Sequence, residues 1–340
     1  MKKQRVLVLV HKDLVPPEGI TTAEVEPAWR MEWDVVTTLR ERGHALQVIS
    51  VHDDLTPIGL SIEEFKPTIV FNLLEAFDNI GVFDQNVVSY LELLKVPYTG
   101  CNPRGLTLAR DKALARKLLA YHRIPSPAFK VIPLRTKPVR PKWLSFPLIV
   151  KSLTYESSAG ISQASVVANQ EQLEKRVKFI HDTLFTPAIV EQFVKGRELY
   201  VGVLGNHRLR VFPVWEMSFA DMPGDNWRIA TERVKWNAAY QKKHGIHTAE
   251  AKLENEVAVK IKHLATRAFR ALDLSGYARF DFRMDETGNP YVIEANPNPQ
   301  LAKAEDFAQS ALHSMTSYSD LLERILALGL EWQPNRMGID

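Results

Sequence analysis

The stretch YARFDFRMDETGNPYVIEANPNPQ, residues 277–300, decides the fold of this chain. Two runs of alternating apolar and polar residues flank DETGNP, a cluster of turn formers, and this pattern predicts a β-hairpin. Pairing Met284 with Tyr291 leaves only those six residues in the turn. Because side chains alternate between the two faces of a strand, this register also fixes which residues share a face.

In this register Asp281 lies opposite Glu294 and Arg279 lies opposite Asn296, with all four side chains on one face. Two facing carboxylates repel each other unless a cation lies between them. The alternative is a solvent-exposed face on which Arg279 neutralises the acids. The apolar residues of FDF and YVIEA favour central, buried strands, where unpartnered carboxylates are too costly to keep. Oxygen ligands suit Mg²⁺, so the face predicts a magnesium site with Arg279 as an extra cation.

The composition is that of a globular protein with more than one lobe. The chain has 340 residues, of which 45% are hydrophobic and 24% charged, so two or three lobes are expected. No apolar run approaches membrane-spanning length, and the start MKKQRVLVLVHKD is read as a buried first strand. The single cysteine, Cys101, excludes an internal disulfide framework and a cysteine-built zinc site. A cytoplasmic location is therefore expected.

Charge and histidine content give little support for nucleic acid or metal-histidine chemistry. The 43 Lys+Arg against 40 Asp+Glu leave a formal charge of +3, and the basic residues are dispersed. Neither a nucleic acid nor a membrane is expected as a partner. The ten histidines are scattered, and the nearest pair, His244 and His247, lies in a polar stretch more typical of a solvated loop than of a metal site.

The first part of the chain alternates strands and helices, which predicts a small parallel sheet open at its carboxyl edge. No G-x-G-x-x-G turn follows the first strand, which argues against a dinucleotide site of the usual kind. The expected strands are residues 5–10, 45–51 and 68–74, and the expected helices are residues 23–43 and 86–95.

The remainder predicts mixed strands and helices with one long loop. Residues 217–248 are polar, spotted with aromatic residues and aperiodic, which favours a functional loop. The other expected elements are a helix at 107–124, a Pro-rich connector at 133–147, a strand at 148–153, a helix at 169–184, strands within 188–216, and helices at 251–274, 306–315 and 318–330.

The hairpin strands, ARFDF and VIEAN, resemble the R-x-D and h-x-E-x-N strands of the ATP-grasp carboxylate–amine ligases, in their D-alanine–D-alanine ligase-like branch. The similarity runs from VPYTGCNPRGLTLARDK to YSDLLERILALGL. It implies an α/β and α+β fold of three lobes, in which an N-terminal parallel α/β lobe precedes two mixed α+β lobes that clamp ATP. The implied division is residues 1–105, 106–190 and 191–332, with a tail at 333–340.

The resemblance also implies a metal and phosphate site. Asp281, Glu294 and Asn296 would bind two Mg²⁺ ions, for which Mn²⁺ could substitute, and Arg279 would lie beside the transferring phosphate and the developing oxyanion. Lys112, Lys151 and Lys235 match lysines that contact ATP phosphates. Taken alone, Lys112 reads as an ordinary exposed helical lysine.

Further positions match the parts of that family which enclose the nucleotide. In ESSAGIS, Ser157 and Ser158 occupy the place of the phosphate-covering loop, although spacing alone fits a plain turn equally well. In VEQFVKGRE, Glu191 would accept from the adenine amino group, Val194 would donate its backbone amide to the ring, and Glu198 would bind the ribose hydroxyls.

The substrate segments depart from the dipeptide ligases. Those enzymes carry an acidic, serine-containing motif after the first strand and a His-Gly segment after the third, where this chain has HKDLVPPEG and NLLEAFDNIGVFDQ. Asn298 and Gln300 replace the serine and glycine of their Ser-Pro-Gly, and Glu75 is the matching candidate in the third-strand segment. These departures put D-alanine–D-alanine ligation in doubt.

The implied reaction joins a carboxylate, of an amino acid or a peptide-like acid, to an amine through an acylphosphate. Residues 217–248 are the expected lid that keeps water from that intermediate. The alternatives are an ATP-grasp kinase of small molecules and a nucleotide-binding regulatory module without chemistry. The expected partners are therefore small molecules, and a homodimer is expected only because it is common in the family.

Overall fold

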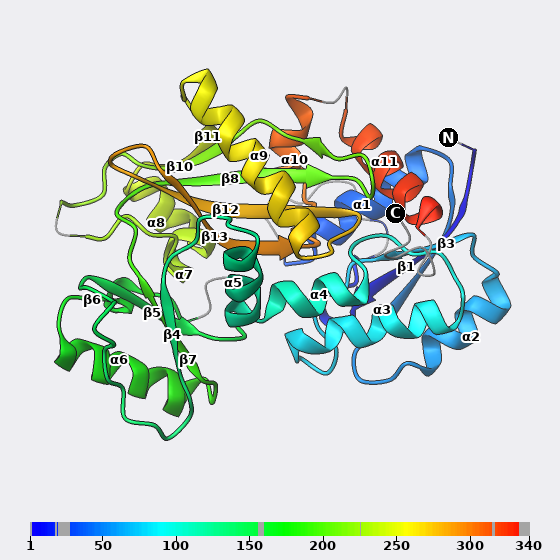
Figure 1. The fold of residues 1–340 in the computed structure, drawn as a ribbon. Helices are drawn as coiled ribbons and strands as arrows, with labels where there is room; N and C mark the ends of the chain where they lie inside the picture. The colour runs from blue at the N-terminus through cyan, green and yellow to red at the C-terminus, as the bar shows by residue number, and fades with distance from the viewer. Residues whose placement is uncertain are drawn as a thin grey trace.

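The computed structural model describes residues 2–17, 19, 28–155, 160–224, 226–314 and 317–332. Ser157, Ser158, the predicted tail and part of the helix expected at 23–43 lie outside these ranges. The described strands form three sheets. Figure 1 shows the N-terminal lobe at the right and the central lobe at the lower left, with the strands of the largest sheet above the central lobe.

The N-terminal lobe contains the predicted parallel sheet. Its strand order is β2-β1-β3, and β1 pairs in parallel with both neighbours. The valine- and leucine-rich run of β1 is fully buried, because the helices α1 and α11 pack against it. The elements are β1 (Arg5–His11), β2 (Ala45–Val51), β3 (Ile69–Asn72), α1 (Arg30–Glu41), α2 (Thr56–Phe65), α3 (Asp84–Leu93) and α11 (Tyr318–Glu331), with short 3₁₀ turns at Lys12–Leu14 and Gly81–Phe83.

The single helix expected at 107–124 is two helices, so that prediction is wrong. They are α4 (Pro103–Arg110) and α5 (Lys112–Tyr121), and the expected lobe boundary at residue 105 falls inside α4. Asp111 has an extended backbone between them, and its carboxylate accepts from the backbone N–H of Leu114 at 2.9 Å. This N-cap ends one helix and starts the next.

The central lobe is a four-stranded sheet covered by one helix. Its strand order is β4-β7-β5-β6, and all its pairings are antiparallel. Leu173, Val177 and Ile180 recur at helical spacing on α6 and pack against the sheet. The elements are β4 (Phe129–Ile132), β5 (Leu148–Ser152), β6 (Val166–Val167), α6 (Gln170–Thr183) and β7 (Ala188–Gln192), with a 3₁₀ turn at Gln163–Ser165.

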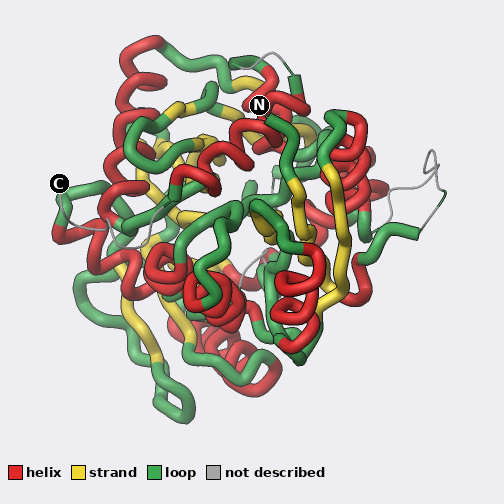
Figure 2. Tube along the Cα trace, turned by 90° about the vertical axis from the view of Figure 1, so that its right-hand side faces the viewer, coloured by secondary structure: helices red, strands yellow, loops and turns green. Residues whose placement is uncertain are grey.

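The largest sheet carries the predicted hairpin at one edge. Its order is β11-β10-β8-β12-β13, with β9 also paired to β8. The elements are β8 (Gly196–Leu204), β9 (Arg210–Val211), β10 (Trp215–Phe219), α7 (Glu232–Trp236), α8 (Ala238–Lys243), β11 (Ile246–Glu250), α9 (Asn255–Ala271), β12 (Tyr277–Asp285), β13 (Pro290–Pro297) and α10 (Asp306–Leu312). Figure 2, turned by 90° from Figure 1, shows helices packed around the strands of the molecule.

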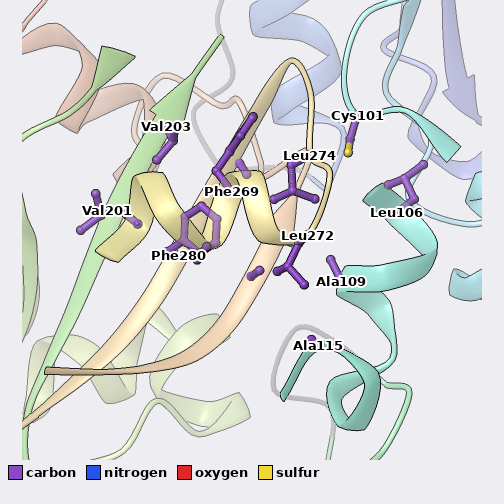
Figure 3. Close-up of a cluster of buried hydrophobic side chains, with 14 of the residues drawn as sticks. Cys101, Leu106, Ala109, Ala115, Val201, Val203, Phe269, Leu272, Leu274 and Phe280 are labelled. Carbon is purple, nitrogen blue, oxygen red and sulfur yellow. The ribbon is translucent and has the colours of Figure 1, made fainter. Parts of the chain in front are cut away.

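The two faces of this sheet differ in chemistry, as the alternating pattern predicts. Phe280 and Val201 point toward α9, where Phe269 meets Phe280 at a ring-centroid distance of 6.5 Å (Figure 3). The same buried cluster continues into Leu106 of α4, so it joins the sheet to the N-terminal half of the chain. The opposite face is therefore left for the charged side chains.

The segment 217–248 is not the aperiodic loop that its sequence suggests. It contains the C-terminal part of β10, the helices α7 and α8, and the start of β11. Its sparse apolar residues, among them Phe219 and Val234, are buried with Tyr200 of β8. These contacts come from distant residues and short elements, which local periodicity does not reveal.

No helix in the described part of the chain combines the length and apolar character needed to cross a membrane.

Glu32 on α1 gives a prediction about stability. It is 1% exposed, and within the described part of the chain neither carboxylate oxygen has a hydrogen-bond partner. Burial, with a smaller contribution from Glu75, raises its pKa from 4.5 to about 7. The folded chain thus binds a proton that the unfolded chain releases between pH 4.5 and 7, so the carboxyl costs stability as the pH rises through that window. At higher pH the cost is about 3 kcal/mol.

Glu32→Gln is therefore expected to raise the thermal midpoint at pH 8 and to leave it nearly unchanged at pH 4.5. Differential scanning fluorimetry at the two pH values measures this difference. Asp34→Asn is the matched control, because Asp34 accepts from Lys303 N at 2.8 Å and from Arg30 at 3.3 Å and should lose stability. A lower midpoint for Glu32→Gln at pH 8 would contradict the prediction.

Candidate active site

The hairpin has the predicted pairings at the charged residues, but its register near the turn differs from the prediction. Arg283 pairs with Tyr291 and Met284 with Pro290, so the expected Met284–Tyr291 pairing is wrong by one residue. The register shifts between Asp281 and Phe282, where β13 carries one extra residue. Beyond this bulge the register matches the prediction.

Asp281 consequently lies opposite Glu294, and Arg279 opposite Asn296. On the other side of β12, Asp281 pairs with Tyr200 of β8. We call the four side chains Arg279, Asp281, Glu294 and Asn296 the charged platform. The exposed fractions of the Arg279, Asp281 and Glu294 side chains are 17%, 10% and 23%, so the exposed-face alternative is wrong about burial.

That alternative is correct about one ion pair. Arg279 binds Asp281 through two hydrogen bonds, with Nε–Oδ1 at 2.8 Å and Nη2–Oδ2 at 3.1 Å. Its guanidinium also lies 4.9 Å from the Tyr200 ring centroid. Burial alone would lower the pKa of Arg279, but Asp281 raises it above its ordinary value, so the guanidinium stays charged.

Lysines from three other elements surround Glu294. Lys112, the first residue of α5, lies 3.1 Å from its carboxylate and donates to Tyr155 O at 2.6 Å. Burial would raise the pKa of Glu294, but Lys112, Lys151 and Lys235 together lower it to about 2. Lys112 is only 8% exposed. The interpretation of Lys112 as an ordinary exposed helical lysine is therefore wrong.

The donor set of the charged platform fits a hard divalent cation. Two carboxylates and one amide are oxygen ligands of the kind that Mg²⁺ prefers. Among the residues that the structure describes, the buried Asn296 Nδ2 has no hydrogen-bond partner, so this nitrogen does not hold the amide in one orientation. Asp281, Glu294 and Asn296 are thus the residues that would hold magnesium.

The second predicted group lies at the crossing from the central lobe to the large sheet. Lys151 on β5 donates to Glu191 Oε2 at 2.8 Å. Glu191 is 1% exposed, and although burial would raise its pKa, Arg116 and Lys151 lower it to about 2. Lys151, Glu191, Val194 and Glu198 line one pocket of about 60 Å³, together with Lys235, Asp281 and Glu294 of the first group.

The groups expected to bind the nucleoside differ in how many hydrogen bonds they already make within the protein. Within the described residues, the backbone N–H of Val194 makes no hydrogen bond, which suits a donor to the adenine ring. Glu198 instead accepts from Arg283 at 2.9 Å and from the Tyr200 hydroxyl at 3.0 Å. A ribose would therefore add to an existing network at Glu198.

Two buried arginines were not predicted, namely Arg283, which lines this pocket, and Arg116, which contacts Glu191. Arg283 donates to Val194 O at 2.6 Å and to Gly196 O at 2.9 Å, and thus ties β12 to the connection between the two lobes. Its place two residues after Asp281 in the alternating strand is a signal that could have found it. Arg116 had no such signal, because one arginine in an amphipathic helix resembles any other.

Arg116 connects three separate segments. It is 3% exposed and donates to Glu191 at 2.8 Å, to Val292 O at 2.8 Å, and to Ile293 O. Ile293 is the extra residue at the bulge, directly before Glu294. One guanidinium therefore holds both the Glu191 carboxylate and the backbone that aligns the charged platform.

Arg116→Met is expected to lower the free energy of unfolding by about 3–5 kcal/mol, because it leaves the Glu191 carboxylate with one cation fewer in a buried site. Arg116→Lys should cost less, since it restores charge but not the two carbonyl contacts. Denaturant unfolding measures both variants, and calorimetry of the folded variants should show weaker ATP binding. Lys117→Met is the control, because Lys117 is exposed on the same helix. Equal stability of Arg116→Met and this control would exclude the positioning role.

A second, larger cavity of about 910 Å³ adjoins the charged platform. The three substrate candidates, Glu75, Asn298 and Gln300, all line it. Arg279, Asn296 and Lys235 line it as well, and Lys235 also lines the 60 Å³ pocket. The cavity therefore receives groups from the N-terminal lobe, from the platform and from the segment 217–248.

Asn298 also has a structural role that the sequence did not indicate. Its Oδ1 accepts from the backbone N–H of Cys101 at 2.7 Å, and its own φ is 51°. A Cβ on Gly100, whose φ is 98°, would lie 2.5 Å from this oxygen. Asn298 thus joins the end of β13 to the N-terminal lobe.

Comparisons with known proteins identify what the chain resembles. Residues 118–327 match the family described as D-ala D-ala ligase C-terminus. The chain is 31% identical over 308 residues to the uncharacterized protein y4sG of Sinorhizobium fredii, which covers 88% of this chain and 87% of the relative. It is 30% identical over 318 residues to the D-alanine–D-alanine ligase of Desulforudis audaxviator, with 92% and 97% covered.

Solved structures agree on the fold. The D-alanine–D-alanine ligase of Bacillus anthracis complexed with ATP superposes with a TM-score of 0.73 at 19% identity, and 96% of this chain and 98% of that chain are covered. The enzyme of Coxiella burnetii gives a TM-score of 0.69 at 19% identity, with 97% and 95% covered.

Proposed function

The chain belongs to the D-alanine–D-alanine ligase family, and we propose that the charged platform is the place where it activates its carboxylate substrate. Membership makes it an ATP-grasp enzyme, dependent on ATP and Mg²⁺, that forms a C–N bond between a carboxylate and an amine. Among the activities that the sequence suggests, this supports the ligase rather than the kinase or the inactive module.

One observation supports this site above the others. The charged platform is continuous with both cavities, since Lys235 lines each of them, Asp281 and Glu294 line the 60 Å³ pocket, and Arg279 and Asn296 line the 910 Å³ cavity. A nucleotide in the first and an acid in the second would meet at these residues. The roles assigned to individual residues are part of the proposal.

In the proposed arrangement, Glu191, Val194 and Glu198 hold the nucleoside. Lys112, Lys151 and Lys235 contact the phosphates. Their charges already converge on Glu294, where they would offset the charge of the phosphate chain. Ser157 and Ser158 keep their proposed place over the phosphates. Asp281, Glu294 and Asn296 hold Mg²⁺, which when bound neutralises developing phosphate charge.

The chemistry then requires two displacements. An oxygen of the substrate carboxylate attacks the γ-phosphorus, the bond from that phosphorus to the leaving ADP oxygen breaks, and an acylphosphate forms. The amine nitrogen attacks the acyl carbon and loses a proton, and phosphate leaves with the electrons of the C–O bond. In this proposal Arg279 stabilises negative charge in both steps, and no protein nucleophile is needed.

We propose an amino acid or a peptide-like acid as the carboxylate substrate, with an amine as its partner. Glu75 and Gln300 line the cavity where these molecules would lie, and Asn298 is partly committed to Cys101. Because Asn298 and Gln300 replace the serine and glycine of the dipeptide ligases, a pair other than D-alanine and D-alanine is proposed. Closure by residues 217–248, a homodimer and a cytoplasmic location are also retained as proposals.

The test is a screen of amino acids and amines, in pairs and singly, for phosphate release from ATP. For an active pair, phosphate should require both substrates, and the product mass should equal their sum minus one water. D-Alanine with itself belongs in the screen and is expected to be a poor substrate. A phosphorylated product formed without an amine would instead identify a kinase, and efficient ligation of D-alanine would overturn the substrate proposal.

A further inference from the structure

A second group of metal-ligating side chains lies at the carboxyl edge of the N-terminal sheet. β1 ends at His11, and His52 follows directly after β2. Their rings meet edge to face, with centroids 5.4 Å apart and an interplanar angle of 84°. Asp53 and Asp78 lie beside them, in the segments that follow β2 and β3. Ends of parallel strands gather at one edge, which is where open α/β sheets bind ligands.

The ligand atoms of this group are already close together. One atom each from His52, Asp53 and Asp78 lie within 4.8 Å of one another. The backbone places Asp78 there, because its N–H donates to His52 O at 2.7 Å. Asp78 and Asn79 have φ angles of 53° and 57°, in a tight turn that Asp and Asn tolerate better than most residues.

The electrostatics favour a cation at this point. The exposed carboxylates of Asp53 and Asp78 lie beside the half-buried His52, and across the described residues neither Asp53 nor Asp78 has a side-chain hydrogen bond or an ion pair. Such a pair is repulsive until a positive charge lies between its members. One histidine nitrogen and two carboxylates form a mixed ligand set that suits Zn²⁺, with water as the fourth ligand. The charged platform, in contrast, offers only oxygen.

A second histidine supports the first. His52 Nδ1 lies 3.4 Å from His11 Nε2, and His11 Nδ1 lies 3.6 Å from Asp13 Oδ2. His52 Nδ1 therefore faces His11, which leaves Nε2 to bind a metal. The backbone N–H of Asp13 donates to His11 Nδ1 at 3.4 Å, so a neutral His11 carries its proton on Nε2 and donates it to His52 Nδ1. His52 would then release its own Nε2 proton when a metal binds, and His11 would hold the ring in place.

We propose that His52 Nε2 and the carboxylates of Asp53 and Asp78 bind one divalent transition-metal ion of the Zn²⁺ type, separate from the magnesium of the nucleotide site. His11 orients His52 and does not bind the ion. The next residue after Asp78, Asn79, lines the 910 Å³ cavity. An ion at this site would therefore hold one wall of the cavity in place.

Isothermal titration with Zn²⁺, in saturating Mg²⁺ and without nucleotide, tests the site. One Zn²⁺ should bind per chain. His52→Ala and Asp78→Asn should lose this binding, and His11→Ala should weaken it by about 10–100-fold. His207→Ala is the matched control, because His207 is exposed in the connection between β8 and β9, and it should bind as the parent does. Thermal midpoints without metal show that each variant is folded.

X-ray absorption of the Zn²⁺-loaded protein adds an independent readout. A single imidazole nitrogen is expected at about 2.0–2.1 Å from the metal. Absence of that nitrogen, or no Zn²⁺ binding by the parent protein, would overturn the proposal. Binding that survives His52→Ala but disappears in Glu294→Gln would place the ion at the nucleotide site and also overturn it. Neither readout depends on ligase activity, so this test is separate from that of the proposed function.

Discussion

Glu294→Gln is expected to reduce ATP-dependent ligation by about 10³-fold or more. Gln keeps the shape of the side chain but removes a charged magnesium ligand, and the charge stabilisation that such an ion supplies to a phosphoryl group is worth several kcal/mol. Lys112 still has Tyr155 O as a partner in the variant, so the lysine is not left alone. Phosphate release with an active substrate pair measures the loss.

The same variant should lower the stability of the ligand-free protein. Repulsion between Asp281 and Glu294 would suggest the opposite, but the structure shows Asp281 held by Arg279 and Glu294 surrounded by lysines. The pKa of Glu294 is about 2 in the fold and 4.5 ordinarily, so its stabilisation is present above pH 4.5 and is lost as the pH falls toward 2. Thermal midpoints at pH 7 should therefore fall in Glu294→Gln.

Glu286→Gln provides the matched control. Glu286 lies in the hairpin turn and forms an exposed ion pair with Lys195 at 3.0 Å, so its replacement should change neither activity nor stability appreciably. Full activity in Glu294→Gln would show that this carboxylate does not bind the catalytic metal.

Arg279→Lys is expected to lower kcat by about 10²–10³-fold, the usual effect of removing one donor to developing negative charge. Lysine keeps the charge, but it cannot hold Asp281 by two parallel hydrogen bonds and also present a donor to the cavity. ATP binding should change little, because Arg279 lines the 910 Å³ cavity rather than the nucleotide pocket.

Steady-state kinetics and calorimetry together separate these two effects. Arg233→Lys serves as the control, since Arg233 is exposed on α7 and lies off the charged platform. If Arg279→Lys weakened ATP binding as much as it lowered kcat, Arg279 would act in nucleotide binding and not on the transition state.

Much of the fold could be read from local patterns. The parallel N-terminal sheet was predicted from the alternating order of strands and helices. The helix α6 and the charged hairpin were predicted because their periods, 3.6 and 2 residues, are established by neighbouring residues alone. The helix at 107–124 failed because Asp111 reads as an ordinary polar residue in a helical stretch. Its capping role depends on one side-chain hydrogen bond to Leu114.

The residues of the candidate site likewise fall into those that the sequence predicted and those that it missed. Arg279, Asp281, Glu294 and Asn296 were found because the alternation of a strand places them on one face. Arg116 and the Cys101 contact of Asn298 were missed because each joins segments more than 70 residues apart. No pattern within a single element carries information about such contacts.

The sequence by itself determined that two carboxylates face each other on a hairpin, because the period of a strand is a local property. The hairpin is not central as expected, since β13 is the edge strand of its sheet. Only the tertiary structure decided what surrounds the two carboxylates. A bulge at Ile293 corrects the register, Arg116 holds that bulge, and lysines from α5, β5 and α7 converge on Glu294. These features depend on how separate lobes pack, and packing is set by long-range contacts that a linear pattern does not contain.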